Sequence, residues 1–162
     1  MIVWVVFFMM SFAVSGSCAS VFQIRLVVDG DGLPKDADRM TLVLTNSTTG
    51  QTHVAVLWVS KTVLIDQNDV QTTRVLTSTS STSNVPSRPE IDVTFTPTGR
   101  KKFAEVTREN INKQLAIVID GQVIDAPIIR TEIPGGTALI VGNFTQSEAI
   151  DLSKKINQAL EK

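Results

Sequence analysis

The stretch that decides the fold runs from residue 91 to residue 157 and reads IDVTFTPTGRKKFAEVTRENINKQLAIVIDGQVIDAPIIRTEIPGGTALIVGNFTQSEAIDLSKKIN. It opens with strict alternation of apolar and polar residues over 91–96, which is the pattern of a strand with one buried face. Thr96 and Pro97 suit the cap and the first position of a helix, because proline lacks only an N–H that has no intrahelical partner there. Apolar residues then recur at helical spacing at Phe103, Val106 and Ile111.

The residues after this helix predict a strand meander. Asn112 tolerates the left-handed backbone with which helices often end. A buried-type strand at 115–119 is followed by Asp120 and Gly121, a strong two-residue hairpin turn. Further extended pieces are expected at 123–124, 128–133 and 138–141. The meander therefore has three or four strands.

A capping box begins the last helix. Thr145 and Glu148 stand at its two positions, so that each side chain satisfies a backbone N–H of the other residue. The inner face of this helix is expected at Ala149, Leu152, Ile156 and Leu160. The fold class predicted for the chain is α+β, with a mostly antiparallel sheet and two main helices packed on one face.

The residues before 91 predict strands. Their alternation and β-branched content indicate strands at 22–28, 40–45 and 53–59, an extended piece at 61–65, and a further strand that opens at Val75. Asp66 is expected to cap a brief helical turn. The predicted organisation is a β-rich part at 20–76, a Ser/Thr/Pro-rich loop at 77–89 within one domain, and an α+β part at 90–162.

The first nineteen residues differ from the rest of the chain. Residues 1–14 carry no charged side chain and are almost wholly apolar, in a run too short to cross ~30 Å of hydrocarbon as a helix. Small residues follow, so we predict a signal peptide over 1–19. Besides retention of the segment as an uncleaved anchor, two alternatives concern Cys18. Its thiol is acylated, as in a bacterial lipoprotein, or ordinary cleavage occurs after Ser17 or Ala19.

The composition argues against several classes of function. The 15 basic and 16 acidic residues give a formal net charge of −1, which gives no reason to expect a nucleic-acid partner. With one cysteine and one histidine, His53, the chain offers no cysteine-based metal cluster and no credible Ser-His-Asp triad. Asp120 and Asp125 flank a turn and form no evident catalytic pair. We therefore expect no enzyme, no metal site and no cofactor.

Three residues form the candidate polypeptide-binding surface. Trp58 and Phe144 are large apolar residues that line a groove for an extended peptide or, alternatively, belong to the core. Arg108, late in the first helix, lies at a partner surface or on a solvated helical face. A basic run at 100–102, near the start of the same helix, opposes the helix dipole; it has a specific use or, alternatively, belongs to a solvated helical face.

Residues 91–157 resemble the head subdomain of the first periplasmic domain of the export proteins SecD and SecDF. The resemblance rests on several motifs in the family's order and spacing. These are Gly99 with Phe103, the run at 107–110, the run at 115–118 with Asp120 and Gly121, Ala126 and Pro127 with Ile129, Gly135 and Gly136 with Ile140, and the run at 142–145 with Glu148 and Ala149. Residues 59–75 resemble, more weakly, the segment that precedes the head.

The resemblance implies the head fold and a non-enzymatic module of the cell envelope. Such a module would contact exported or unfolded polypeptide as an accessory of protein export, in association with Sec translocon subunits. It would be exported and lie in the periplasm or at the outer surface, with or without a lipid anchor at Cys18. The family's proton-driven motor is not implied for this chain alone. The alternative is a structural or assembly subunit of an envelope complex that docks through a sheet edge.

Overall fold

A computed structural model describes residues 20–28, 35–45, 51–77, 89–142 and 144–161. The predicted signal peptide with Cys18, and most of the loop at 77–89, lie outside the described residues. The strands are β1 (Phe22–Val27), β2 (Ala37–Thr45), β3 (Thr52–Asp66), β4 (Val70–Thr77), β5 (Pro89–Phe95), β6 (Leu115–Ile119), β7 (Gln122–Asp125) and β8 (Thr137–Ile140). The helices are α1 (Pro97–Glu109) and α2 (Gln146–Leu160), and a 3-10 turn, η1 (Gln67–Asp69), links β3 to β4.

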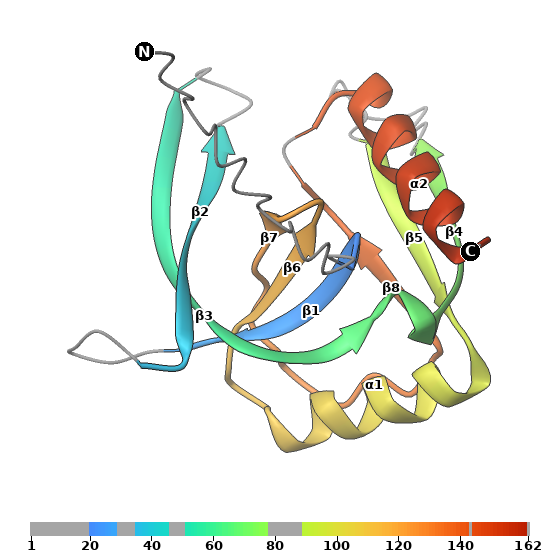
Figure 1. The fold of residues 1–162 in the computed structure, drawn as a ribbon, viewed down its shortest axis with the longest axis horizontal. Coiled ribbons are helices and arrows are strands. Elements are labelled where there is room, and N and C mark those ends of the chain that lie inside the picture. The colour runs from blue at the N-terminus through green and yellow to red at the C-terminus, as the bar shows by residue number, and fades with distance from the viewer. Residues whose placement is uncertain (1–19, 29–34, 46–50, 78–88, 143, 162) are drawn as a thin grey trace, which may run out of the picture.

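The strands form two sheets (Figure 1). Strands β1, β3, β2, β7 and β6, in that order, close into a barrel, and β4, β5 and β8 form a three-stranded sheet. All described strand pairs are antiparallel except β2 with β7. The predicted α+β class with a mainly antiparallel arrangement is confirmed, and the strands are divided between two sheets.

The predicted meander is only partly present. Strands β6 and β7 form the expected hairpin, and Asp120 and Gly121 both have the positive φ that this turn requires (52° and 77°). The segment 128–133 is not a strand, and it makes one isolated bridge, between Ile128 and Gln114. Strand β8 then crosses to the other sheet and pairs with β5, because its one buried side chain, Ile140, lies opposite the buried Ile91.

Both helix starts follow the sequence prediction. The Thr96 side chain accepts a hydrogen bond from the Gly99 N–H at 3.0 Å, and the capping box that begins α2 is complete. Helix α1 ends at Glu109, and Asn112 has the expected left-handed backbone, with φ 68°. The prediction that Ile111 belongs to the buried stripe of α1 was wrong. Because the helix ends before it, Ile111 is 44% exposed.

The first half of the chain also matches its pattern. Strand β3 is one continuous strand over both predicted extended pieces, and the Asp66 side chain caps η1 as expected. Strand β4 starts earlier than the predicted opening at Val75. The polar residues at 71–74 gave no apolar strand pattern, yet Thr73 is buried, with its hydroxyl donating to the Ser153 carbonyl of α2 at 3.1 Å.

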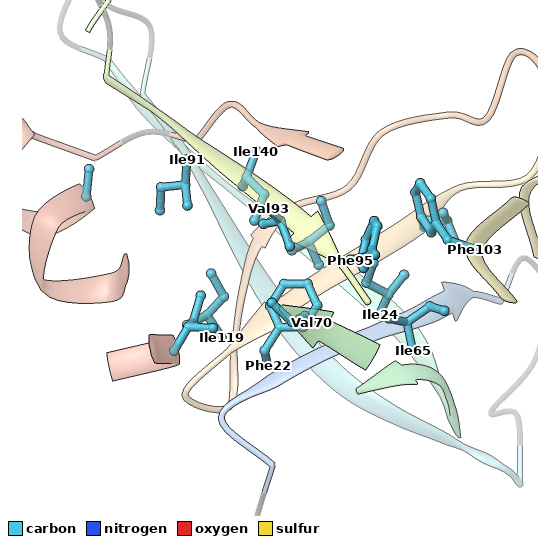
Figure 2. Packing of buried hydrophobic residues seen from close by; sticks show 14 of the residues in the cluster. Phe22, Ile24, Ile65, Val70, Ile91, Val93, Phe95, Phe103, Ile119 and Ile140 are labelled. Carbon is cyan, nitrogen blue, oxygen red and sulfur yellow. The ribbon is translucent and has the colours of Figure 1, made fainter. Parts of the chain in front are cut away.

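One hydrophobic core joins the two sheets. Figure 2 shows side chains from β1, β5 and α1, among them Phe22, Phe95 and Phe103, pointing toward one another. The rings of Phe95 and Phe103 lie 4.7 Å apart, centroid to centroid. Helix α2 adds Ala149 and Ile156 to this core, as its predicted inner face requires. A smaller cluster fills the barrel, and it includes buried Leu42, Val59 and Val118.

The basic start of α1 has a structural explanation. The Lys102 ammonium lies 2.7 Å from the Asp69 carboxylate of η1, and the Arg100 Nε donates to the Pro134 carbonyl at 2.8 Å. Gly99 lets the helix approach η1, since a Cβ there would lie 2.1 Å from the Asp69 carbonyl oxygen. The basic run therefore ties α1 to its neighbours.

Candidate polypeptide-binding surface

Strands β2 and β3 form a ribbon that lacks charged residues over most of its length; its charged residues, Asp38, Arg39, Lys61 and Asp66, lie at one end. No Asp, Glu, Lys or Arg occurs between residues 40 and 60. Antiparallel partners point to the same face of a sheet. Leu42 and its neighbours on one face fill the barrel, whereas Val43 and its partner Val54 point outward and are 48% and 62% exposed. The ribbon thus presents an aliphatic surface to solvent.

Trp58 lies on this outward face. It is two residues beyond Val56, which is also exposed, and it pairs with Arg39 across the ribbon. Its side chain is half-buried, and its carbonyl accepts a hydrogen bond from the Val28 N–H at 2.7 Å. Neither hydrophobic cluster includes Trp58 among the described residues. Of the two alternatives drawn from the sequence, this placement favours a surface role.

A cavity of about 390 Å³ lies beside the ribbon, between β2, β7 and α2. We call it the α2 cleft. Its apolar lining includes Val43, Ile124, Phe144 and Leu152, and its charged lining comes from α2 as Glu148, Asp151 and Lys155. The cleft is therefore apolar toward the strands and charged along the helix. Figure 1 shows the ribbon and α2 on opposite sides of β6 and β7.

Phe144 belongs both to the core and to the α2 cleft. Its half-buried ring packs against the main core cluster while lining the cleft. Gly142 makes room for the ring, because a Cβ at that position would lie 2.2 Å from Phe144 Cε1. The two alternatives considered for Phe144 are thus compatible.

A second cavity, of about 360 Å³, is almost entirely apolar. We call it the apolar groove. It lies between β8 and the segment 127–133, and buried Ile24, Phe103 and Leu115 contribute to its lining. Its exposed aliphatic side chains are Ile128, Ile133 and Leu139, which are 47%, 37% and 47% exposed. Strand β8 is an edge strand of its sheet.

The wall of the apolar groove is fixed at both ends. At one end, the Ile129 N–H donates to the Lys113 carbonyl at 2.9 Å. At the other end, the Ile133 N–H donates to the hydroxyl of buried Thr107 at 3.0 Å. An irregular segment held in this way keeps a defined shape without belonging to a sheet.

Arg108 is exposed in the last turn of α1, where its charge suits the helix dipole. Trp58, Arg108 and Phe144 lie on or next to three different elements, β3, α1 and α2. In the described part of the chain, only Phe144 of these three lines either cavity. The structure therefore does not gather the three candidates at one site.

The titratable groups near the α2 cleft have defined partners. The backbone N–H and the hydroxyl of Thr145 both donate to Glu148, which holds the pKa of that carboxyl below its usual value. The Asp120 carboxylate, 2.7 Å from the Lys155 ammonium, raises the pKa of Lys155, and Asp151 adds to the effect. Burial raises the pKa of Asp125, against hydrogen bonds from the backbone of Ala126 and Val141.

Asp120 lies in the hairpin turn and pairs with Lys155, whereas Asp125 is half-buried at the end of β7, so their environments differ. Within the described ranges, no group of three or more His, Cys, Asp or Glu side chains could hold a metal ion. Within the same ranges, neither helix is long and apolar enough to span a bilayer.

Comparison with known proteins places this fold. The family model of the SecDF P1 head subdomain matches residues 41–160. The chain belongs to this family. The match extends the resemblance seen in residues 91–157 back through the ribbon of β2 and β3.

Individual SecD and SecDF proteins agree with the family model. The SecDF translocase subunit of Thermus thermophilus is 54% identical over 66 residues, which is 41% of this chain and 9% of that protein. The SecD subunit of Magnetococcus marinus is 34% identical over 121 residues, which is 75% of this chain and 22% of that protein. The chain thus spans less than a quarter of the length of these relatives.

Solved SecDF structures share the fold. A structure described as a membrane component SecDF that enhances protein export matches with a TM-score of 0.60 and 28% identity, over 85% of this chain and 61% of that one. SecDF in a super-membrane-facing form matches with a TM-score of 0.62 and 28% identity, over 85% of this chain and 18% of that one. The head fold predicted from the sequence is confirmed.

Neither cavity is predictable from the sequence. The ribbon did leave a signal in the sequence. Residues 40–60 cover parts of two strands and contain no charged residue, whereas exposed strand edges usually carry charged residues or proline. The apolar groove left no local signal, since its lining comes from β1, α1, β6 and β8.

Proposed function

We propose that this SecDF head chain is a non-enzymatic binding module that serves protein export by holding extended segments of exported polypeptide in the apolar groove. The observation that carries the proposal is the groove itself, with its apolar lining and the exposed side chains of Ile128, Ile133 and Leu139. Contiguous exposed apolar surface of this kind marks binding sites in soluble domains.

The groove suits an extended, unfolded ligand. Its edge strand, β8, offers backbone groups for strand addition, which is independent of the ligand's sequence. Apolar side chains of a ligand that pack on its aliphatic lining contribute a binding free energy of about 25 cal/mol per Å² of apolar surface removed from water. A protein that handles many different exported chains needs this combination, because backbone contacts supply generality and apolar contacts supply affinity.

A binding experiment tests the proposal directly. The full chain would be titrated into a fluorescently labelled, permanently unfolded polypeptide, and binding followed by anisotropy. Leu139→Gln should weaken binding about tenfold, because one buried aliphatic contact of ~1.5 kcal/mol is lost. Ile111→Gln is the matched control, since Ile111 is similarly exposed and lies outside the groove. Equal affinity of both variants for the polypeptide would rule out the groove as its site.

We further propose that the chain is exported, that residues 1–19 act as its signal peptide, and that it works beside Sec translocon subunits in the periplasm or at the outer surface. The support is the family membership together with the apolar start of the chain. Mass spectrometry of the mature N-terminus tests the location. Acylated Cys18 would establish a lipid anchor, and a mature chain that begins after Ser17 or Ala19 without acyl groups would exclude one.

A second candidate function is a structural subunit that docks through the ribbon. It is favoured by the absence of charge over residues 40–60, because exposed strand edges are normally protected by charged residues or proline. Val54→Lys would abolish co-purification with the Sec translocon if the ribbon docks there. Unchanged co-purification, combined with loss of polypeptide binding in Leu139→Gln, would favour the groove function alone.

A further inference from the structure

We propose that the α2 cleft binds an extended polypeptide segment in which a basic side chain, Lys or Arg, stands beside apolar residues. The inference rests on the proposed polypeptide-binding function and specifies which segments are preferred. It concerns a different cavity from the apolar groove, so the two can be tested separately.

The strand side of the cleft suits an aliphatic chain. Val43, which is 48% exposed, lines the cleft together with the half-buried side chains of Phe144 and Leu152. Lysine and arginine bury their methylene stems along such surfaces while the charged group stays in water. The cleft therefore offers contact to the stem of a basic residue as well as to an apolar neighbour.

The helix side of the cleft carries net negative charge. Glu148 and Asp151 are three residues apart on α2, so their carboxylates lie on one face. The hydrogen bonds from Thr145 hold the pKa of Glu148 below its ordinary value and so favour the carboxylate form. Lys155 is the cation that lines the cleft, and the Asp120 carboxylate on the adjoining hairpin turn already pairs with it at 2.7 Å.

The Asp151 carboxylate is available to pair with a cationic ligand. Among the residues that the structure describes, its carboxylate makes no salt bridge. A cation that enters the cleft would thus meet two carboxylates and a lysine whose charge is balanced. A phosphate or a carboxylate would meet the same two carboxylates and be repelled.

The backbone of β2 supports an extended ligand. Strand β2 bridges β7 at one described position, between Leu42 and Val123. Val43 follows this bridge directly and lines the cleft. Beyond this bridge the described part of β2 pairs with β3 alone, so the side of β2 that faces the cleft has no further strand pairing there. We expect an extended polypeptide to pair with β2 at this point. The alternating side chains of such a strand would point in turn toward Phe144 and toward solvent.

Three peptides of identical Val/Thr-rich sequence, with a central Lys, Gln or Glu, would test the inference. Their affinities for the full chain would be measured by anisotropy at low and at high salt. We expect the Lys peptide to bind about threefold to fivefold more tightly than the Gln peptide, which is the upper part of the range for an exposed ion pair, and the Glu peptide to bind most weakly. High salt should reduce the differences.

Asp151→Asn should remove the preference for the Lys peptide. Glu105→Gln is the matched control, because it removes one exposed carboxylate from α1, outside the cleft. Amide chemical-shift changes around Val43, Phe144 and Leu152 on addition of the Lys peptide would support binding in the cleft.

Equal affinities for the three peptides would overturn the inference, as would the same loss of preference in Glu105→Gln. If binding of all three peptides is instead lost in Leu139→Gln, the apolar groove holds them, and the proposed function stands while this inference falls. If Leu139→Gln leaves the binding of unfolded polypeptide unchanged but the Lys preference depends on Asp151, the inference stands and the groove proposal falls.

Discussion

At the scale of single residues, Gly142 controls the position of Phe144 and with it the shape of the α2 cleft. An added Cβ would lie 2.2 Å from the Phe144 ring and 2.9 Å from Ile124 Cγ2, closer than side-chain atoms pack. Either the ring or the backbone must move to admit it.

Gly142→Ala should therefore destabilise the protein by about 1–3 kcal/mol, the usual cost of overpacking. Urea unfolding followed by circular dichroism measures this free energy. Gly135→Ala is the control, because nothing lies within 4 Å of its added Cβ and its φ is not positive. A Gly142→Ala variant as stable as Gly135→Ala would contradict the assigned contact.

The sequence alone shows that the basic run at 100–102 is unusual, but it does not show which residues the run contacts. Three cations at the start of a helix oppose its dipole, and this is visible without a structure. The partners of Lys102 and Arg100, Asp69 and the Pro134 carbonyl, are more than thirty residues away in opposite directions along the chain. Only the fold brings them together.

At the scale of elements, α2 depends on its first turn. The Thr145 hydroxyl accepts from the Glu148 N–H at 3.3 Å, and the Thr145 N–H donates to Glu148 at 2.7 Å. Thr145→Ala should cost about 1 kcal/mol of unfolding free energy at pH 7, the typical value of a helix cap. Urea unfolding checks it, with Ser147→Ala as the control in the same turn. An equal effect of the two substitutions would argue against the cap.

The same cap makes stability depend on pH in a defined direction. The folded-state pKa of Glu148 lies below its ordinary value of 4.5. Ionised Glu148 therefore stabilises the fold above that value, and the contribution is lost as pH falls through the folded-state pKa. The wild type should exceed Glu148→Gln in unfolding free energy at pH 7, and the difference should shrink below about pH 4.5. A difference that grows on acidification would refute this assignment.

Strand β8 shows that a local sequence pattern predicts a strand but not its pairing partner. The apolar run at 138–141, after the turn residues at 134–136, predicted a strand in the right place but not its partner, because a local pattern does not state which strand lies alongside. Burial of the Ile140 side chain decides which strand β8 pairs with. Paired with β5, β8 places Ile140 opposite Ile91, and both side chains belong to the main core.

At the scale of the whole molecule, we propose that the β-rich part at 20–76 and the α+β part at 90–162 fold as one unit. The main core draws Phe22, Ile24 and Ile65 from the first part and Ile91, Val93 and Phe95 from the second. Figure 2 shows these side chains of the two parts packed in one cluster.

One cooperative unfolding transition is expected for this reason. In a Trp4→Phe variant, emission reports Trp58 in the first part, while far-ultraviolet circular dichroism is dominated by the two helices of the second. The two probes should give the same midpoint in urea. Separate midpoints would show that the parts unfold independently.

The fold was more predictable than the site. Strands, caps and turns have local causes, such as the alternation at 91–96 and the Asp120-Gly121 turn, so they can be read along the chain. The apolar groove is built from side chains more than a hundred residues apart, from Ile24 to Leu139. Such a site exists only after two sheets have packed together.

The central claim is that extended polypeptide binds in the apolar groove. Photocrosslinking from position 128, with a photoreactive residue in place of exposed Ile128, tests it most directly in the full chain mixed with an unfolded exported protein. We predict strong crosslinks from position 128 and weak ones from the control position 111, which is equally exposed but outside the groove. Equal crosslinking from both positions, or none from position 128, would contradict the claim.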